Sequence, residues 1–303
     1  MDSENSRSVT LLLLDGTPTG LIQAEIMNWN GQALMGPRSR IGEILKRDES
    51  AGTGVYFLVG DDPDQPTRKR IYIGEGDVVS DRIKSHSTDE SKEFWDQVCL
   101  VTAKWNLNKA HVRYLESRLI QIAKESGRAN LANGNDPGKK SLSEAETAYM
   151  ESFLRQTRLI LKILGFDFLR PKVDGTPHSK QTNADANEHS NAIELTLIGK
   201  KHGYAAKAIE SDGEVTVLAG STAMTGMGSA QNAYSSLREL LIKDGQLRLV
   251  PGGTLMEFAE NVAFKSPSAA ASVINNHNTN GRKDWKLKST GQTLKEWQDS
   301  QAV

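Results

Sequence analysis

The stretch Thr53-Gly-Val-Tyr-Phe-Leu-Val-Gly60 and the stretch Arg70-Ile-Tyr-Ile-Gly74 decide how the first half of this chain folds. Both runs are apolar and rich in β-branched and aromatic residues, a pattern typical of β-strands. Residues 61–68, which separate them, are rich in Pro and Asp and therefore predict a connecting loop. The two strands would pair and bring Tyr56 and Tyr72 close enough to converge on one point.

A short helix is expected directly after these strands. Residues 77–86 predict a helix whose first turn is capped by Asp77 or Ser80. Arg82 and His86 are four residues apart and therefore share one face of this helix.

A third strand is expected at residues 97–103, followed by a helix over residues 109–126 that Asn108 opens and Gly127 closes. Glu116 lies at the edge of the apolar stripe of this helix, so its carboxylate can point along the sheet toward the tyrosines. The stripe itself recurs at the three- and four-residue steps of a buried face: Val112, Leu115, Leu119 and Ile122.

In order and spacing, these elements resemble those of the GIY-YIG nucleases. The shared elements follow one another over residues 51–135: Gly54-Val-Tyr56, Tyr72-Ile-Gly74, Arg82, His86, Glu116 and a loop asparagine. The spacing leaves both Asn130 and Asn133 open as that asparagine, and the surrounding sequence favours Asn133. The resemblance implies an α+β nuclease domain with a three-stranded antiparallel sheet flanked by helices.

The resemblance also implies a chemical role for each side chain. Glu116 would hold one divalent cation, Mg²⁺ or Mn²⁺, which would stabilise the leaving oxygen of a phosphodiester. Arg82 would donate two parallel hydrogen bonds to the phosphate. Tyr56 would orient or deprotonate the attacking water in a cluster with Tyr72, and His86 would assist because a phenol is a poor base near neutral pH.

Each of these side chains also has a purely structural interpretation. The tyrosines could be half-buried strand aromatics, His86 a partner of the helix dipole, and Arg82 and Glu116 members of solvated ion pairs. Two positions depart from the family pattern, because Val55 replaces the usual Ile and Glu75 follows Tyr-Ile-Gly. A carboxylate at position 75 would repel a phosphate unless it helps to bind metal.

Four segments surround the nuclease-like one. Residues 1–50 predict an N-terminal β-rich extension with a hairpin and a short helix, which we expect to pack on the sheet. Residues 136–169 predict a packing helix opened by the capping-box sequence Ser143-Glu-Ala-Glu146. Residues 170–190 are polar and predict a linker. Residues 191–303 predict a second α+β domain, with strands near residues 192–198, 204–209, 215–218 and 247–250 and helices near residues 230–243 and from residue 266.

This second domain resembles a small C-terminal domain of unknown function that follows GIY-YIG domains, and also modules proposed to read DNA in restriction–modification systems. The resemblance rests on residues 262–271, on Asn280-Gly281 and on Trp285-Lys286. Residues 224–228 are glycine-containing but lack the lysine of a Walker loop, so they do not predict a nucleotide site. A basic cluster would contact DNA or form ordinary solvated surface: Arg282, Lys283, Lys286 and Lys288.

The composition sets outer bounds on the kind of protein. The chain has 303 residues, 37% of them hydrophobic, which is enough for two domains with their own cores. Residues 51–135 carry 12 basic and 12 acidic side chains, so this segment by itself should bind nucleic acid modestly. The single cysteine, Cys99, excludes an intrachain disulfide and a cysteine-based zinc site. An acidic start before the short apolar run at residues 11–14 argues against a signal peptide, so we expect a cytoplasmic protein that does not enter a membrane.

We therefore expect a divalent-metal-dependent endonuclease that hydrolyses phosphodiester bonds, with DNA as substrate and a restriction- or repair-like role. RNA is the alternative substrate. The alternative function is a catalytically inactive nucleic-acid-binding protein on the same scaffold. In either case the second domain would recognise or dock the target.

Overall fold

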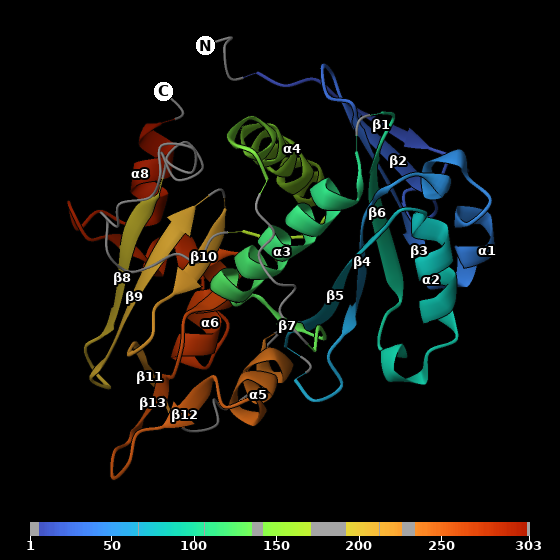
Figure 1. Cartoon of the computed structure of the whole chain (residues 1–303). Coiled ribbons are helices and arrows are strands. Elements are labelled where there is room, and N and C mark those ends of the chain that lie inside the picture. The colour runs from blue at the N-terminus through green and yellow to red at the C-terminus, as the bar shows by residue number, and fades with distance from the viewer. Residues whose placement is uncertain are drawn as a thin grey trace. The chain divides into compact units, whose positions relative to one another are not determined.

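The computed structural model describes residues 6–65, 67–105, 107–134, 142–170, 192–211, 213–225 and 234–301. The chain divides into two units, Met1–Lys172 and Val173–Val303 (Figure 1). The expected linker at residues 170–190 lies outside the described residues except for Arg170. Each unit has its own sheets and its own hydrophobic core.

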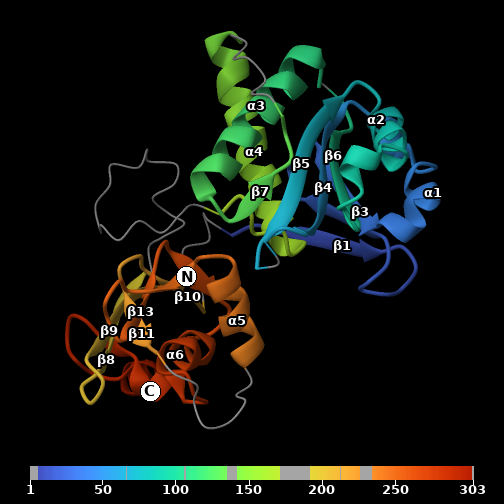
Figure 2. The same cartoon turned by 90° about the horizontal axis from the view of Figure 1, so that it is seen from below.

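The described part of the first unit is built on a seven-stranded sheet with the order β1-β2-β3-β6-β4-β5-β7 (Figure 2). Neighbouring strands are antiparallel except β5 and β7, which are parallel. The expected strands at residues 53–60, 70–74 and 97–103 are confirmed as β4, β5 and β6. The strands are β1 (Val9–Leu13), β2 (Ile22–Ile26), β3 (Gly31–Pro37), β4 (Gly54–Asp61), β5 (Lys69–Gly76), β6 (Gln97–Ala103) and β7 (Ala129–Leu131).

This sheet is larger than the three strands expected for the nuclease-like segment. β3 pairs with β6 along its whole length, from Gly31 opposite Ala103 to Pro37 opposite Gln97. The N-terminal extension therefore continues the sheet by edge pairing instead of packing on it. The physical reason is that β6 pairs with β4 along its other edge, and an open edge would leave a row of backbone N–H and C=O groups without partners. β7 adds a further strand beside residues 69–71 of β5.

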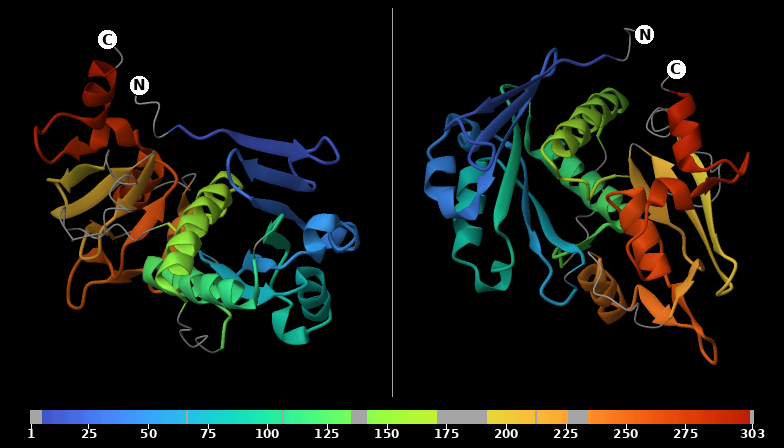
Figure 3. Two further views of the ribbon diagram at one scale, coloured as in Figure 1. Left: turned by 45° about the horizontal axis from the view of Figure 1, so that its top comes forward. Right: turned by 180° about the vertical axis from the view of Figure 1, so that it is seen from behind.

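Helices cover both faces of this sheet (Figure 3). α3 (Lys109–Ser126) and α4 (Glu144–Ile163) pack on one face, and α1 (Ile41–Ile44) and α2 (Val79–Ser87) pack on the other. Side chains alternate along a strand, so β4 sends Phe57 into the core with α3 and α4, and sends Tyr56 and Leu58 into the core with α2. Burial on both faces explains the unbroken apolar sequence of β4.

The expected caps of the two long helices are confirmed. The Asn108 side chain accepts a hydrogen bond from the backbone N–H of His111 at 3.0 Å, and Gly127 ends α3 with a φ of 59°. Ser143 and Glu146 form the capping box at the start of α4.

The expected cap of α2 is wrong. The helix begins at Val79, and within the described residues neither Asp77 nor Ser80 caps its first turn. The backbone N–H of Val79 donates instead to the carbonyl oxygen of Gly52 at 3.2 Å. A first-turn donor of α2 is thus satisfied by the backbone just before β4, which no local sequence signal reveals.

The second unit also combines sheets and helices. Its described residues form a five-stranded sheet with the order β14-β10-β9-β8-β15 and a three-stranded sheet with the order β11-β13-β12. The strands are β8 (Ile193–Gly199), β9 (Tyr204–Ser211), β10 (Glu214–Val217), β11 (Thr222–Met224), β12 (Leu247–Leu249), β13 (Leu255–Phe258), β14 (Val262–Phe264) and β15 (Lys286–Leu287). The helices are α5 (Ser235–Lys243), α6 (Pro267–Asn275), α7 (Gly281–Asp284) and α8 (Leu294–Ser300).

Most of the elements that the sequence predicts for this unit are confirmed. β8, β9 and β10 are the expected antiparallel strands, β12 is the expected strand near residue 247, and α6 begins after its cap Ser266. The expected helix at residues 230–243 is present as α5, and residues 226–233 lie outside the described residues. Both units are therefore of the α+β class. Among the described residues, no helix combines the length and the apolar character needed to cross a membrane.

Candidate functional site

Tyr56, Tyr72 and His86 form an aromatic cluster on the α2 side of the sheet. The Tyr56 hydroxyl oxygen lies 2.8 Å from Nε2 of His86. The ring centroids of the two tyrosines are 6.2 Å apart, and those of Tyr72 and His86 are 5.0 Å apart. Tyr56 is fully buried and His86 is nearly so, whereas Tyr72 is half-buried. The convergence of the two tyrosines that the sequence predicts is therefore found.

Burial sets the protonation states in this cluster. Burial, and then the charge of Lys92, lowers the pKa of His86 to about 4, so its imidazole is neutral near pH 7. Burial, and then the nearby Tyr72, raises the pKa of Tyr56 far above its usual range, so the phenol keeps its proton. A protonated phenol donates to the unprotonated nitrogen of a neutral imidazole. We therefore assign the imidazole proton of His86 to Nδ1, which lies 3.9 Å from the Asp89 carboxylate.

Two glycines of β5 make room for the site. Gly74 lies opposite Tyr56 in the register of β4 and β5, and a Cβ at position 74 would stand 2.3 Å from the Tyr56 hydroxyl oxygen. A Cβ at position 76 would stand 2.9 Å from Cγ of Arg82. The glycine of Tyr-Ile-Gly is thus a steric requirement of the tyrosine on the next strand.

Glu116 is half-buried on α3, and charges from other elements act on its carboxylate. Burial, and then the carboxylate of Glu75, raises the pKa of Glu116 to about 7, while the positive charge of Arg82 acts in the opposite direction. The charge of Arg82 also acts on Tyr56, whose pKa it lowers against the larger effect of burial. The exposed Arg82 of α2 is therefore close enough to influence both the tyrosine cluster and the carboxylate.

The Glu75 carboxylate is held by two cations of α3. It accepts a hydrogen bond from Nζ of Lys109 at 2.8 Å and lies 3.7 Å from Nε of Arg113. These two positive charges offset the repulsion expected between a carboxylate at position 75 and a phosphate. The sequence signal for this arrangement is the i, i+4 spacing of Lys109 and Arg113 on the helix that carries Glu116, but their partner is far away in the sequence.

Of the two candidate asparagines, Asn133 lies beside the cluster. Its Oδ1 accepts from the backbone N–H of Ile73 at 3.1 Å, and its Nδ2 donates to the carbonyl oxygen of Ile73 at 2.7 Å. Ile73 is the middle residue of Tyr-Ile-Gly, so Asn133 fixes the backbone of β5 next to the site. Asn130 donates instead to Asp62 in the loop between β4 and β5, at the other end of β5.

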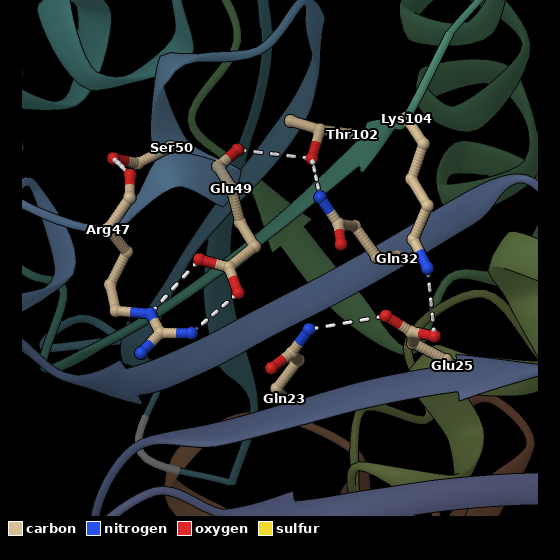
Figure 4. Close-up of polar contacts among 8 residues, drawn as sticks. All are labelled: Gln23, Glu25, Gln32, Arg47, Glu49, Ser50, Thr102 and Lys104. Carbon is tan, nitrogen blue, oxygen red and sulfur yellow. Dashed lines mark hydrogen bonds and ion pairs between the residues drawn. The ribbon is translucent and has the colours of Figure 1, made fainter.

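The N-terminal extension makes polar contacts in the turn that leads into β4 (Figure 4). In the turn that precedes β4, two N–H groups of Arg47 donate to the Glu49 carboxylate at 3.0 and 2.7 Å. The hydroxyl of Thr102 on β6 donates to the backbone carbonyl of Glu49 at 3.1 Å. This turn leads into Gly52, whose carbonyl accepts from Val79. The extension thus helps to position the helix that carries the candidate arginine and histidine.

Glu116 offers carboxylate oxygens, which are the ligands that Mg²⁺ and Mn²⁺ prefer. In the described part of the chain, no three or more His, Cys, Asp or Glu side chains group together so as to hold a metal ion. A cation here would rest mainly on Glu116 and on water, which suits Mg²⁺ because it keeps several waters when bound. Burial and the charge of Glu75 both disfavour a bare Glu116 carboxylate, so a bound cation would relieve both. The residues present therefore fit the ion.

The basic cluster of the second unit is partly neutralised within that unit. Arg282 donates to Gln298 at 2.6 Å and to the Asp299 carboxylate at 2.9 Å. Lys288 pairs with Glu194 at 2.5 Å. The other two cations, Lys283 and Lys286, are exposed.

Trp285, next to this basic cluster, is fully buried and donates through its ring N–H to the backbone of Pro267. It is therefore part of the core of the second unit and cannot stack on a base without leaving that core.

Residues 197–298 match a family described as a domain of unknown function, DUF4357. The match lies within the second unit and supports the expected C-terminal domain of unknown function. Comparisons with curated proteins and with solved structures found no match. For residues 51–135, the resemblance to GIY-YIG nucleases therefore rests on the residues and the geometry described above.

Proposed function

We propose that residues 51–135 form a GIY-YIG-type nuclease domain that hydrolyses phosphodiester bonds in DNA with Mg²⁺ or Mn²⁺. The observation that carries this proposal is geometric: the Tyr56 hydroxyl oxygen lies 2.8 Å from Nε2 of His86 beside Tyr72, and Arg82 packs against Gly76 at the end of the same strand. Phosphodiester hydrolysis needs a group that handles the proton of water, a cation for the phosphoryl oxygens and a ligand for a metal ion. Tyr56, Arg82 and Glu116 are one residue of each kind.

In this proposal, Tyr56 and His86 handle the proton of the attacking water. As the water oxygen attacks phosphorus, the Tyr56 oxygen accepts its proton and passes its own proton to Nε2 of His86, 2.8 Å away. Nε2 of the neutral imidazole carries no proton in the tautomer assigned above and can therefore accept it. The negative charge of a bound phosphate favours the imidazolium that results. Tyr72 packs against both rings.

Arg82 and Glu116 act on the phosphate side of the reaction. The exposed guanidinium of Arg82 can reach a phosphate and donate parallel hydrogen bonds to oxygens on which negative charge grows. Glu116 would hold the divalent cation, which supplies stabilisation of the leaving oxygen when bound. Asn133 keeps the Tyr-Ile-Gly backbone in place through its two bonds to Ile73.

We propose that the second unit recognises or docks the target. The support is its basic cluster, of which Lys283 and Lys286 are the members best placed for contact with DNA phosphates because they are exposed. Arg282 and Lys288 would first have to exchange their carboxylate partners.

The test is cleavage of supercoiled plasmid DNA by the full chain in Mg²⁺ or Mn²⁺, with EDTA as the metal-free control. Glu116→Ala should abolish cleavage, whereas Glu125→Ala should not, because Glu125 is exposed near the other end of the same helix. Both variants should be folded at the assay temperature, as judged by circular dichroism. Cleavage at the wild-type rate by Glu116→Ala would remove Glu116 as the metal ligand. DNA binding by a wild-type protein that never cuts would favour the catalytically inactive alternative.

A further inference from the structure

Glu75, Lys109 and Arg113 form a charged cluster that the reaction described above does not use. The Glu75 side chain is only 13% exposed, whereas those of Lys109 and Arg113 are 41% and 43% exposed. The cluster therefore presents its positive members to solvent and keeps the carboxylate that joins them largely covered. Asp77 also meets Lys109, at 3.4 Å.

The two cations lie on the same face of α3 as Glu116. Lys109, Arg113 and Glu116 are spaced by four and three residues, which places them one above another on the helix. Four residues span about 6 Å along a helix axis. That length covers about two nucleotide steps of a DNA strand, at 3.4 Å per step. Two cations about 6 Å apart can therefore contact two phosphates of one strand, beside a reacting one.

Glu75 prepares these cations for binding. An ammonium has three N–H donors and a guanidinium five, so contact with one carboxylate leaves donors for a further acceptor on both side chains. Long basic side chains lose rotamer freedom when they bind, and a carboxylate that already holds them reduces that loss. The helix that carries them is well fixed, because Asn108 caps its first turn.

We propose that Lys109 and Arg113 bind the backbone phosphates of DNA next to the phosphate that is cleaved, and that Glu75 positions them. The inference rests on the proposed nuclease function for the identity of the ligand. It assigns a substrate path along the first two turns of α3. It also gives Glu75, the departure from the family pattern, a positioning role.

The test measures binding by the full chain to a fluorescent DNA duplex of about 30 base pairs, in EDTA, between about 50 and 200 mM salt. Each phosphate contact contributes about 0.9 to the slope of log affinity against log salt concentration. The double variant Lys109→Gln with Arg113→Gln should therefore lower that slope by about 2. The control is Lys69→Gln with Arg248→Gln, also one Lys and one Arg paired with carboxylates, and 52% and 61% exposed. The control should keep the wild-type slope.

Loss of both cations leaves Glu75 without them in a largely covered position, which can destabilise the first unit. The comparison is therefore repeated in proteins that also carry Glu75→Gln. The triple variant, with Lys109→Gln, Arg113→Gln and Glu75→Gln, should show a slope lower by about 2 than Glu75→Gln alone. An equal slope in test and control variants, an unchanged slope in the test variants, or no binding of wild type to the duplex overturns the inference. Because the assay needs no cleavage, a lowered slope in a protein that never cuts would refute the nuclease and keep the phosphate contacts. Cleavage by the wild type together with an unchanged slope in the test variants would refute the phosphate contacts and keep the nuclease.

Discussion

Gly74→Ala should damage both the stability of the first unit and the candidate site, because its new methyl group enters space that Tyr56 occupies. The added Cβ would stand 2.3 Å from the Tyr56 hydroxyl oxygen and 2.4 Å from Cζ. The register of β4 and β5 puts Gly74 directly opposite Tyr56, so the two positions cannot separate without opening the ladder. The Tyr56 ring has little room to retreat, because it is fully buried and its hydroxyl is held by His86.

The size of the effect follows from these contacts. Forcing an extra methyl into a packed interior costs about 1–3 kcal/mol, and loss of the Tyr56–His86 hydrogen bond adds about 1 kcal/mol. We therefore expect the free energy of unfolding to fall by about 2–4 kcal/mol. In a unit of this length each kcal/mol lowers the midpoint of thermal unfolding by about 2–4 °C. If the proposed mechanism holds, cleavage should fall as well, because the Tyr56 phenol is displaced.

The assay is thermal unfolding followed by circular dichroism, beside plasmid cleavage. Gly42→Ala is the matched control: a Cβ on this exposed helical glycine meets nothing within 4 Å, so the change should be neutral or slightly stabilising. In a double-mutant cycle, Gly74→Ala should cost little once Tyr56→Ala has removed the ring. A Gly74→Ala protein that unfolds and cleaves as the wild type does would refute this reasoning.

Two further predictions concern charge. With metal removed, the folded-state pKa of Glu116 near 7, raised from 4.5 by burial and then by Glu75, makes this group favour folding at acid pH. That contribution is lost as pH rises through about 7, so urea unfolding in EDTA should show wild type losing stability between about pH 5 and 8 relative to Glu116→Gln. In the second unit, Arg238 is buried and donates to the carbonyl oxygens of Val273 and Met224, and burial lowers its pKa. Arg238→Met should lower the unfolding free energy of that unit by about 2–4 kcal/mol, seen as an earlier transition in urea, because the buried carbonyl of Val273 and the partly buried carbonyl of Met224 lose their donor. An unchanged transition would contradict this.

The sequence predicts elements well where the signal is local. Apolar runs bounded by turn residues give β4, β5 and β6, and a cap at each end gives α3 with its observed bounds. It fails where the partner is distant. The start of α2 depends on Gly52, and the width of the sheet depends on the edge with which β3 pairs. The residues of α2 and β3 themselves predict neither contact. In the second unit, the elements that the sequence does not predict are short, such as β11 and β15, and long-range pairing stabilises them.

The candidate site shows the same difference between local and long-range signals. The residue types and their order along the chain are sufficient to predict that Tyr56, Tyr72 and His86 lie together. The reason for Gly74 is not visible in the same way, because it requires the register of two strands. The choice between Asn130 and Asn133 likewise depends on which end of β5 each side chain reaches, since both follow α3 within a few residues.

β5 explains why so many of these groups meet at one end of the sheet. Successive residues of a strand point to opposite faces, so Tyr72 and Gly74 face α2, while Ile73 and Glu75 face α3. One strand therefore carries part of the aromatic cluster on one face and the Glu75 carboxylate, with its cations, on the other. A register shift of one residue would exchange the two sets and destroy both. Such a shift is opposed by Asn133, which bonds both backbone groups of Ile73. It is also opposed by Tyr56, because a residue with a Cβ in the place of Gly74 would collide with the Tyr56 hydroxyl. The site thus depends on the register of one strand pair, and we expect substitutions that loosen that register to affect proton transfer and phosphate binding together.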